Sequence, residues 1–266
     1  MAALDHLVIN TLRNMDEAAD AFAALGFELT PRGHHSLGSI NHLMVVDGAY
    51  LELVGVPAEG LQRQEVLDSP LGLSGLVFQS ADADATYQRL TNAGLPALEP
   101  LAFSRPVALI SGREEAAAFR TVRLARERTP AGRVYFCQHL TPDLVWREEW
   151  MHHPNGFAAI TQVVIESPNP EADAGLYASL CDAPATRGAD GWHVPLAGAE
   201  LLIVDGPKPR FATAHLEFET LDVIAARART VKGVTWQAKA DGSASLSLPA
   251  FDLSLVCRVA SARSRP

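Results

Sequence analysis

Cysteines are scarce in this sequence and long apolar runs are missing, which excludes several kinds of protein. The 266 residues include three cysteines, Cys137, Cys181 and Cys257. An odd, widely spaced set predicts buried free thiols in a reducing cytoplasm and argues against a disulfide framework. The longest apolar stretches are strand-sized, below the ~20 residues that a membrane span needs. The N-terminus has no basic segment followed by an apolar run, so we expect a cytoplasmic protein without a secretory signal or a membrane partner.

Basic clusters and nucleotide-binding motifs are also lacking. The formal net charge is −9, and nucleic acid is not an expected partner because its binding depends on a basic surface. The sequence has no Gly-x-Gly-x-x-Gly fingerprint, P-loop, nucleophile elbow or Cys-x-x-Cys pair, which argues against a nucleotide cofactor. The 48% of hydrophobic and 20% of charged residues are typical of a soluble globular protein.

One pattern, a strand followed by a helix and three further strands, recurs along the chain. It opens at Leu4, Gly75, Ala158 and Ala214. A unit of this size cannot bury its sheet face alone, so the units must pair. The sequence predicts an α+β fold of four βαβββ modules, paired into two domains with curved mixed sheets around a cleft. The expected parts are a first pair with the candidate site (1–145), a crossover linker (146–157), a second pair (158–260) and a frayed tail (261–266).

The first strand, 4–11, carries a histidine in an apolar setting. Strand alternation places His6, Val8 and Asn10 on one face and Asp5, Leu7 and Ile9 on the other. The alternative reading of His6 is a hydrogen-bonded histidine kept for packing.

The fourth strand, 49–56, has Glu52 on the same face as Tyr50 and Val54. A carboxylate among apolar neighbours needs a partner, although Glu52 could also be an edge residue that faces water.

Further polar residues are candidates for contact with a substrate. Arg105 and Arg120 could hold a carboxylate through the guanidinium fork, or could form surface ion pairs. Asn41 could bond to the substrate or to its own turn. Alternation allows only one of Gln138 and His139 to face a cleft unless the strand bends. His139 could instead be a strand-end residue that caps the crossover.

Several short motifs, in this order and spacing, resemble the vicinal oxygen chelate superfamily, which includes glyoxalase I, bleomycin-resistance proteins and extradiol dioxygenases. The local signatures are most similar to the glyoxalase-like group of uncharacterised bacterial proteins. The motifs are Leu4-Asp5-His6-Leu7-Val8, Leu37-Gly38-Ser39-Ile40-Asn41-His42, Tyr50-Leu51-Glu52-Leu53-Val54, Gln138-His139-Leu140-Thr141-Pro142 and His153-Pro154-Asn155-Gly156.

The resemblance implies a metal site. Ligands in metal-using members come from the first and fourth strands of paired modules, which implies His6 and Glu52, with His139 as the third ligand. Such a set suits Zn, Ni, Fe or Mn. The second module departs from the pattern because it has Gly75-Leu76-Val77 where a ligand is expected. The fourth module has His215 but no clear carboxylate partner.

The resemblance also implies an activity. We expect a divalent-metal lyase, isomerase or dioxygenase that acts on a small oxygenated metabolite, with Glu52 also serving as a base and with Asn41, Tyr50, Arg105, Arg120 and Gln138 in contact with the substrate. The alternative is a metal-free protein of the bleomycin-resistance type that binds or sequesters a small molecule. Either form is expected as a monomer or a homodimer.

Overall fold

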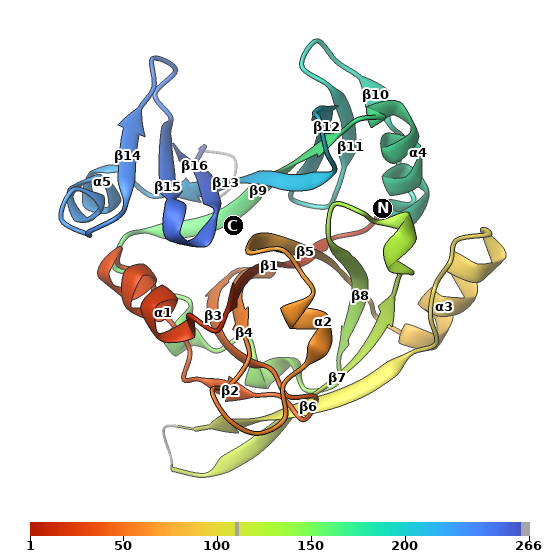
Figure 1. Cartoon of the computed structure of the whole chain (residues 1–266), viewed down its shortest axis with the longest axis horizontal. Coiled ribbons are helices and arrows are strands. Elements are labelled where there is room, and N and C mark those ends of the chain that lie inside the picture. Colours follow the sequence, from red (N-terminus) through yellow and green to blue (C-terminus); the bar gives the residue numbers. More distant parts are fainter. Residues whose placement is uncertain (110–111, 262–266) are drawn as a thin grey trace.

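A computed structural model describes residues 1–109 and 112–261, and its strands form two eight-stranded sheets (Figure 1). Residues 262–266 of the predicted tail, 261–266, lie outside the described residues. The first sheet has the order β2-β3-β4-β1-β5-β8-β7-β6. Its strands are β1 (Leu4–Leu12), β2 (Gly33–His34), β3 (Ile40–Val46), β4 (Ala49–Gly55), β5 (Gly72–Gln79), β6 (Leu101–Ala108), β7 (Glu114–Arg123) and β8 (Arg133–His139).

The second sheet repeats this arrangement strand for strand, in the order β10-β11-β12-β9-β13-β16-β15-β14. Its strands are β9 (Phe157–Ser167), β10 (Thr186–Arg187), β11 (Trp192–Pro195), β12 (Glu200–Asp205), β13 (Arg210–Phe218), β14 (Thr235–Ala238), β15 (Ala244–Leu248) and β16 (Leu253–Val259). Each sheet therefore contains two βαβββ modules, and the predicted fold class is confirmed. The last strand of the first sheet ends at His139, and the first strand of the second sheet begins at Phe157, the last residue of the predicted linker, 146–157. The division into domains stays a prediction.

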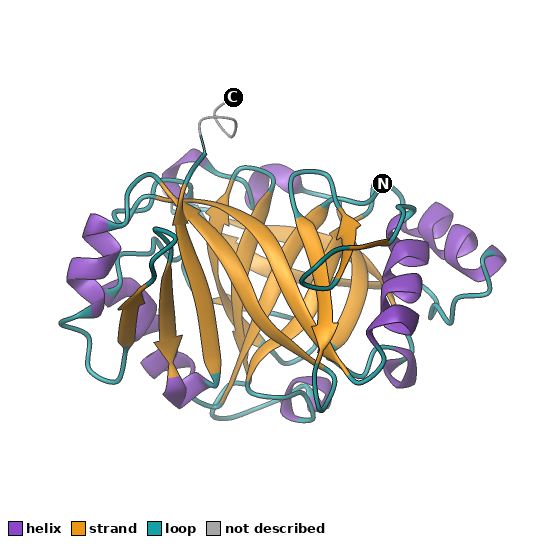
Figure 2. Ribbon diagram, turned by 90° about the horizontal axis from the view of Figure 1, so that it is seen from above, coloured by secondary structure: helices purple, strands orange, loops and turns teal. Residues whose placement is uncertain are grey.

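The helices are α1 (Met15–Ala24), α2 (Gln64–Leu67), α3 (Ala83–Asn92), α4 (Pro170–Cys181) and α5 (Asp222–Ala228). Asp82 caps α3 by accepting hydrogen bonds from the backbone N–H groups of Asp84 and Ala85. Asn14 precedes α1, but its side chain makes no capping hydrogen bond. Figure 2 shows the strands in the middle of the molecule and most helices towards its two ends.

The two faces of the first sheet belong to different hydrophobic cores. The outer face, with Leu7 and Ile9, shares one core with Val163 and Ile165 of the second sheet. The inner face, with Val8, Val77 and Cys137, builds a smaller core of its own. The sheet curls almost closed around α2, with α1 and α3 outside it (Figure 1). Polar groups on the inner face are therefore enclosed.

Alternation along β1 is interrupted at Asp5. In the antiparallel pairing with β5, Leu4 lies opposite Phe78 and His6 lies opposite Val77, so two steps along β1 match one step along β5. Such a bulge leaves one extra residue and re-aims its side chain. Asp5 consequently lies on the inner side with His6, and the expectation that it shares a face with Leu7 and Ile9 is wrong.

The segment between the sheets packs across the inner core of the first sheet. Leu144, Val145 and Trp150 are buried there. His153 ties the segment down, since its Nε2 lies 2.8 Å from the Val45 carbonyl oxygen and its Nδ1 accepts a hydrogen bond from the Glu28 N–H at 2.9 Å. The segment therefore covers part of the inner core of the first sheet.

Candidate active site

A cavity of about 160 Å³ lies inside the first sheet. Side chains from β1, β3, β4, β6, β7 and β8 line it, together with residues around α2. Phe103 and Phe119 give it an apolar wall. The titratable side chains that line it are His6, His35, Glu52, Arg63, Glu65, Arg105, Arg123, Arg126, Arg133, Tyr50, Tyr135 and Cys137.

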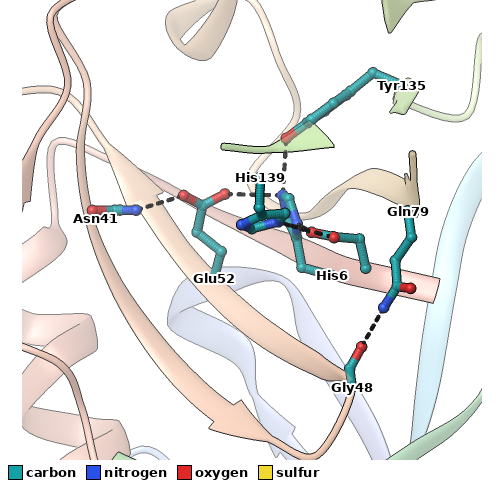
Figure 3. Close-up of polar contacts among 8 residues, drawn as sticks. His6, Asn41, Gly48, Glu52, Gln79, Tyr135 and His139 are labelled. Carbon is teal, nitrogen blue, oxygen red and sulfur yellow. Dashed lines mark hydrogen bonds and ion pairs between the residues drawn. The ribbon is translucent and has the colours of Figure 1, made fainter. Parts of the chain in front are cut away.

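A continuous line of polar contacts runs through the inner face of the sheet (Figure 3). Asn41 Nδ2 donates to Glu52 Oε1 at 2.7 Å, and Glu52 Oε2 lies 3.5 Å from His6 Nε2. On the other side of the ring, His6 Nδ1 lies 2.5 Å from Asp5 Oδ1. Asp5 in turn lies 3.0 Å from His139 Nε2. The line therefore links β3, β4, β1 and β8.

Asp5 is the ionised centre of this line. Burial would raise the pKa of its carboxyl group, but hydrogen bonds from His139 and His6 outweigh that effect and lower the pKa to about 2. An ionised carboxylate can only accept hydrogen bonds, so both His6 Nδ1 and His139 Nε2 must carry protons. A neutral His6 then has its free lone pair on Nε2, the atom that faces Glu52 and the cavity.

Glu52 is buried, with 6% of its surface exposed. Burial raises the pKa of this carboxyl group, but His6, His35 and the hydrogen bond from Asn41 lower it by more, so the net shift is downward. Glu52 is therefore a carboxylate at neutral pH. The sequence expectation that a carboxylate in this strand needs a partner is met by Asn41 and His6.

The residue that matches Glu52 in the second module is Tyr135. Val8 pairs with Glu52 across β1 and β4, and Val77 pairs with Tyr135 across β5 and β8. Tyr135 Oη lies 3.2 Å from His6 Nε2. Burial raises the pKa of Tyr135 far above its usual value, so the group is a neutral phenol.

His139 does not join His6 and Glu52 at the cavity. Its Nε2 is bonded to Asp5, and its Nδ1 is buried without a hydrogen-bond partner among the described residues. The expected set of His6, Glu52 and His139 is therefore not assembled around one point. A different group, Asp5, Cys137 and His139, has ligand atoms within 4.8 Å of one another. Burial raises the pKa of the Cys137 thiol, so a metal that binds there would have to displace the thiol proton.

Three of the five predicted substrate contacts line the cavity: Asn41, Tyr50 and Arg105. The Tyr50 ring stacks on His6 with the centroids 4.4 Å apart. Alternation predicted that only one of Gln138 and His139 faces the cleft. This is confirmed, since only His139 lies on the inner face of the sheet.

The other two, Arg120 and Gln138, lie on the outer face of the sheet. Arg120 pairs with Asp84 through two contacts of 2.7 Å. Gln138 accepts from the Ala83 N–H and donates to the Ala81 carbonyl oxygen beside α3. Because alternation sends both side chains away from the cavity, their expected role in substrate binding is wrong.

Sequence reasoning missed Asp5, Tyr135 and Arg133. The bulge that turns Asp5 inward has no local signal in the sequence. Tyr135 could have been found by aligning the second module on Val8 and Val77. Arg133 lies at the start of β8, a position where the sequence alone predicts a surface residue at the end of a strand.

The fold and this site together identify the class of protein. The chain has the two-sheet, four-module architecture of the vicinal oxygen chelate superfamily, with a polar centre where first and fourth strands meet. The family model for the glyoxalase-like domain matches residues 4–181. The chain therefore belongs to the glyoxalase-like domain family.

Solved structures share this fold at low sequence identity. A hypothetical protein from Staphylococcus aureus is 13% identical, with a TM-score of 0.69 over 98% of this chain and 100% of that one. The Mn(II)-bound glyoxalase from Novosphingobium aromaticivorans is 11% identical, with a TM-score of 0.57 over 98% and 89%. A xylose isomerase-like TIM barrel/4-hydroxyphenylpyruvate dioxygenase fusion protein is 13% identical, with a TM-score of 0.57 over 97% and 49%. At these identities the likeness establishes the fold alone.

No curated protein matches this sequence. Within the described part of the chain, none of the helices has the length and apolar character needed to cross a bilayer.

Proposed function

We propose that this chain is a divalent-metal enzyme of the glyoxalase-like type, with its reaction centre at His6 and Glu52. One observation carries the proposal: Asp5 holds the Nδ1–H of His6, so that Nε2 faces Glu52 Oε2 at 3.5 Å on the cavity wall. A carboxylate behind a histidine in this way is the usual means of orienting a metal-binding imidazole.

The donor atoms fit a divalent metal. His6 Nε2 and Glu52 Oε2 would hold the ion, and an imidazole with a carboxylate suits Zn, Ni, Fe or Mn. The Mn(II)-bound glyoxalase with the same fold supports a metal of this kind. A bound ion would supply Lewis-acid polarisation of substrate oxygens.

The protein's own groups have distinct roles in this proposal. Asn41 fixes Glu52 Oε1, and Glu52 Oε2, which would be a labile ligand of the ion, could also take a proton from the substrate. Tyr50 keeps the His6 ring in plane by stacking on it. The Tyr135 hydroxyl, kept protonated by burial, can donate to an oxyanion that develops in the cavity. These roles suit a lyase, an isomerase or a dioxygenase.

The test is metal uptake and turnover in wild type and Glu52→Gln. The amide is isosteric, yet it binds divalent metal poorly and cannot take a proton, so we expect loss of bound metal and at least a hundredfold loss of turnover on any substrate found in a screen of 2-oxo aldehydes and catechols. Glu166→Gln, which removes a half-buried partner of Arg210 on the second sheet, far from the cavity lining, is the control. Full metal content and activity in Glu52→Gln would overturn the proposal.

A second candidate is a metal-free binding protein that uses the same cavity. Gly75 and Tyr135 favour it, because the second module supplies neither a histidine nor a carboxylate at the two matching positions. Protein that takes up no added Zn, Ni, Mn or Fe, yet is stabilised by small molecules, would support this candidate. A small-molecule partner, no nucleic acid or membrane partner, a cytoplasmic location and a monomeric or homodimeric state remain predictions.

A further inference from the structure

Five arginines line the cavity, and they fall into two groups. Arg63 and Arg123 both donate to Glu65, and Arg126 donates to the Asp68 carbonyl oxygen. These three cations have anionic or carbonyl partners within the chain. Arg105 and Arg133 form the second group.

Arg105 and Arg133 present buried N–H groups that no described residue accepts. Arg105 Nη2, Arg133 Nε and Arg133 Nη2 are buried without a hydrogen-bond partner among the described residues. Arg105 is only 3% exposed. A buried cation with unsatisfied donors is costly unless something pairs with it.

The backbone makes room for the guanidinium of Arg105. Gly33 in β2 lies so close that a Cβ atom there would be 2.9 Å from Arg105 Cδ and 2.3 Å from Asn41 Oδ1. A side chain at this position would clash with both Arg105 and Asn41. Asn41 is the residue that holds Glu52, so the glycine keeps the arginine beside the reaction centre.

The local charges leave a positive surplus. Glu65 is shared by Arg63 and Arg123, and Glu52 is engaged by Asn41 and His6. Neither carboxylate is hydrogen-bonded to Arg105 or Arg133. This surplus lies inside a protein whose formal charge is −9, so it is a local feature of the cavity.

We propose that Arg105 and Arg133 form a subsite for the carboxylate of the substrate, which makes the substrate a small organic acid. The planar fork of a guanidinium matches a carboxylate. The rings of Phe103 and Phe119 stack with their centroids 5.2 Å apart, and they would pack against the short carbon chain of such an acid. This inference rests on the proposed function, because it names the class of substrate that the same cavity would bind.

The experiment measures binding in chelator-treated protein by calorimetry and thermal shift, so that it does not depend on a metal. The probes are pyruvate and malonate, with pyruvamide and malonamide as neutral matches and inorganic phosphate as a competing anion. Variants Arg105→Gln and Arg133→Gln are compared with Arg120→Gln, which alters an arginine on the outer face. Arg105→Lys keeps the charge and removes the fork.

We expect at least one of the two acids to bind while its amide does not, with affinity lowered tenfold or more in Arg105→Gln and Arg133→Gln and unchanged in Arg120→Gln. Arg105→Lys should lie between wild type and Arg105→Gln. Each of four results would overturn the proposal. These are equal binding of acids and amides, unchanged affinity for the acids in both glutamine variants, tighter binding of phosphate than of the acids, and no binding of either acid. Metal content should be unchanged in the arginine variants, so a failed subsite and a failed metal centre give different results.

Discussion

Asp5 and His6 are consecutive residues of β1, yet both side chains lie on the inner side of the first sheet, with Asp5 Oδ1 2.5 Å from His6 Nδ1. The bulge against β5 makes this contact possible. It places an ionised carboxylate behind the histidine and directs Nε2 toward Glu52. The first strand therefore supplies the proposed metal ligand and the group that orients it.

Asp5→Asn should weaken metal binding without removing the site. An asparagine amide can donate as well as accept, so it no longer requires a proton on His6 Nδ1. Loss of such an orienting carboxylate lowers metal affinity about 10–100-fold. Competition with a chelator measures the effect, and Asp84→Asn, which removes an exposed partner of Arg120, should leave the affinity unchanged. Equal affinities in Asp5→Asn and wild type would show that Asp5 does not orient the ligand.

Arg105→Gln should stabilise the ligand-free protein. Removing a buried cation with an unpaired donor should raise the free energy of unfolding by about 1–3 kcal/mol. Arg120→Gln breaks an exposed ion pair and should change it by less than about 1 kcal/mol. Denaturant titration of both variants checks this, and destabilisation by Arg105→Gln would mean that the arginine is compensated within the chain.

His35 should make stability depend on pH between about 4 and 6.5. Burial lowers the pKa of this imidazole to about 4, Arg105 and Arg63 act in the same direction, and Glu52 opposes them. The unfolded chain therefore binds more protons in this window, so the free energy of unfolding falls as pH falls through it. The contribution is roughly 3 kcal/mol.

His35→Gln should remove that part of the pH dependence. The difference between variant and wild type should be constant above about pH 7.5, where the imidazole is neutral in both states, and should change steadily down to pH 4. Urea titrations at several pH values measure it. Parallel curves across the whole range would contradict the assignment.

Gly75→Ala should destabilise the first sheet. A Cβ atom at this position would lie 2.8 Å from Val8 Cγ2 and 2.9 Å from Val8 Cβ, and overpacking of this kind costs about 1–3 kcal/mol. Gly175 in α4 has open space around it, so Gly175→Ala should stabilise by up to about 1 kcal/mol. A neutral Gly75→Ala would show that close packing does not explain why the second module has no ligand here.

The sequence was sufficient for the fold because its signals are local and repeated. The order of strand, helix and three strands recurs four times, and alternation placed His6 with Val8 on one face of its strand and Glu52 with Tyr50 on one face of another. Alternation failed at Asp5, because a bulge depends on the register with a neighbouring strand. It also could not separate Arg105 from Arg120, since burial of an arginine is decided by tertiary packing and not by neighbours in the chain.

The most direct test of the central claim is the metal content of protein purified without chelator or His-tag, compared in wild type, His6→Ala and Cys137→Ala. The two variants separate the His6–Glu52 pair from the Asp5, Cys137 and His139 group. We predict close to one equivalent of divalent metal in wild type and in Cys137→Ala, and almost none in His6→Ala. Metal that persists in His6→Ala, or that is lost in Cys137→Ala alone, would contradict a metal centre at His6 and Glu52.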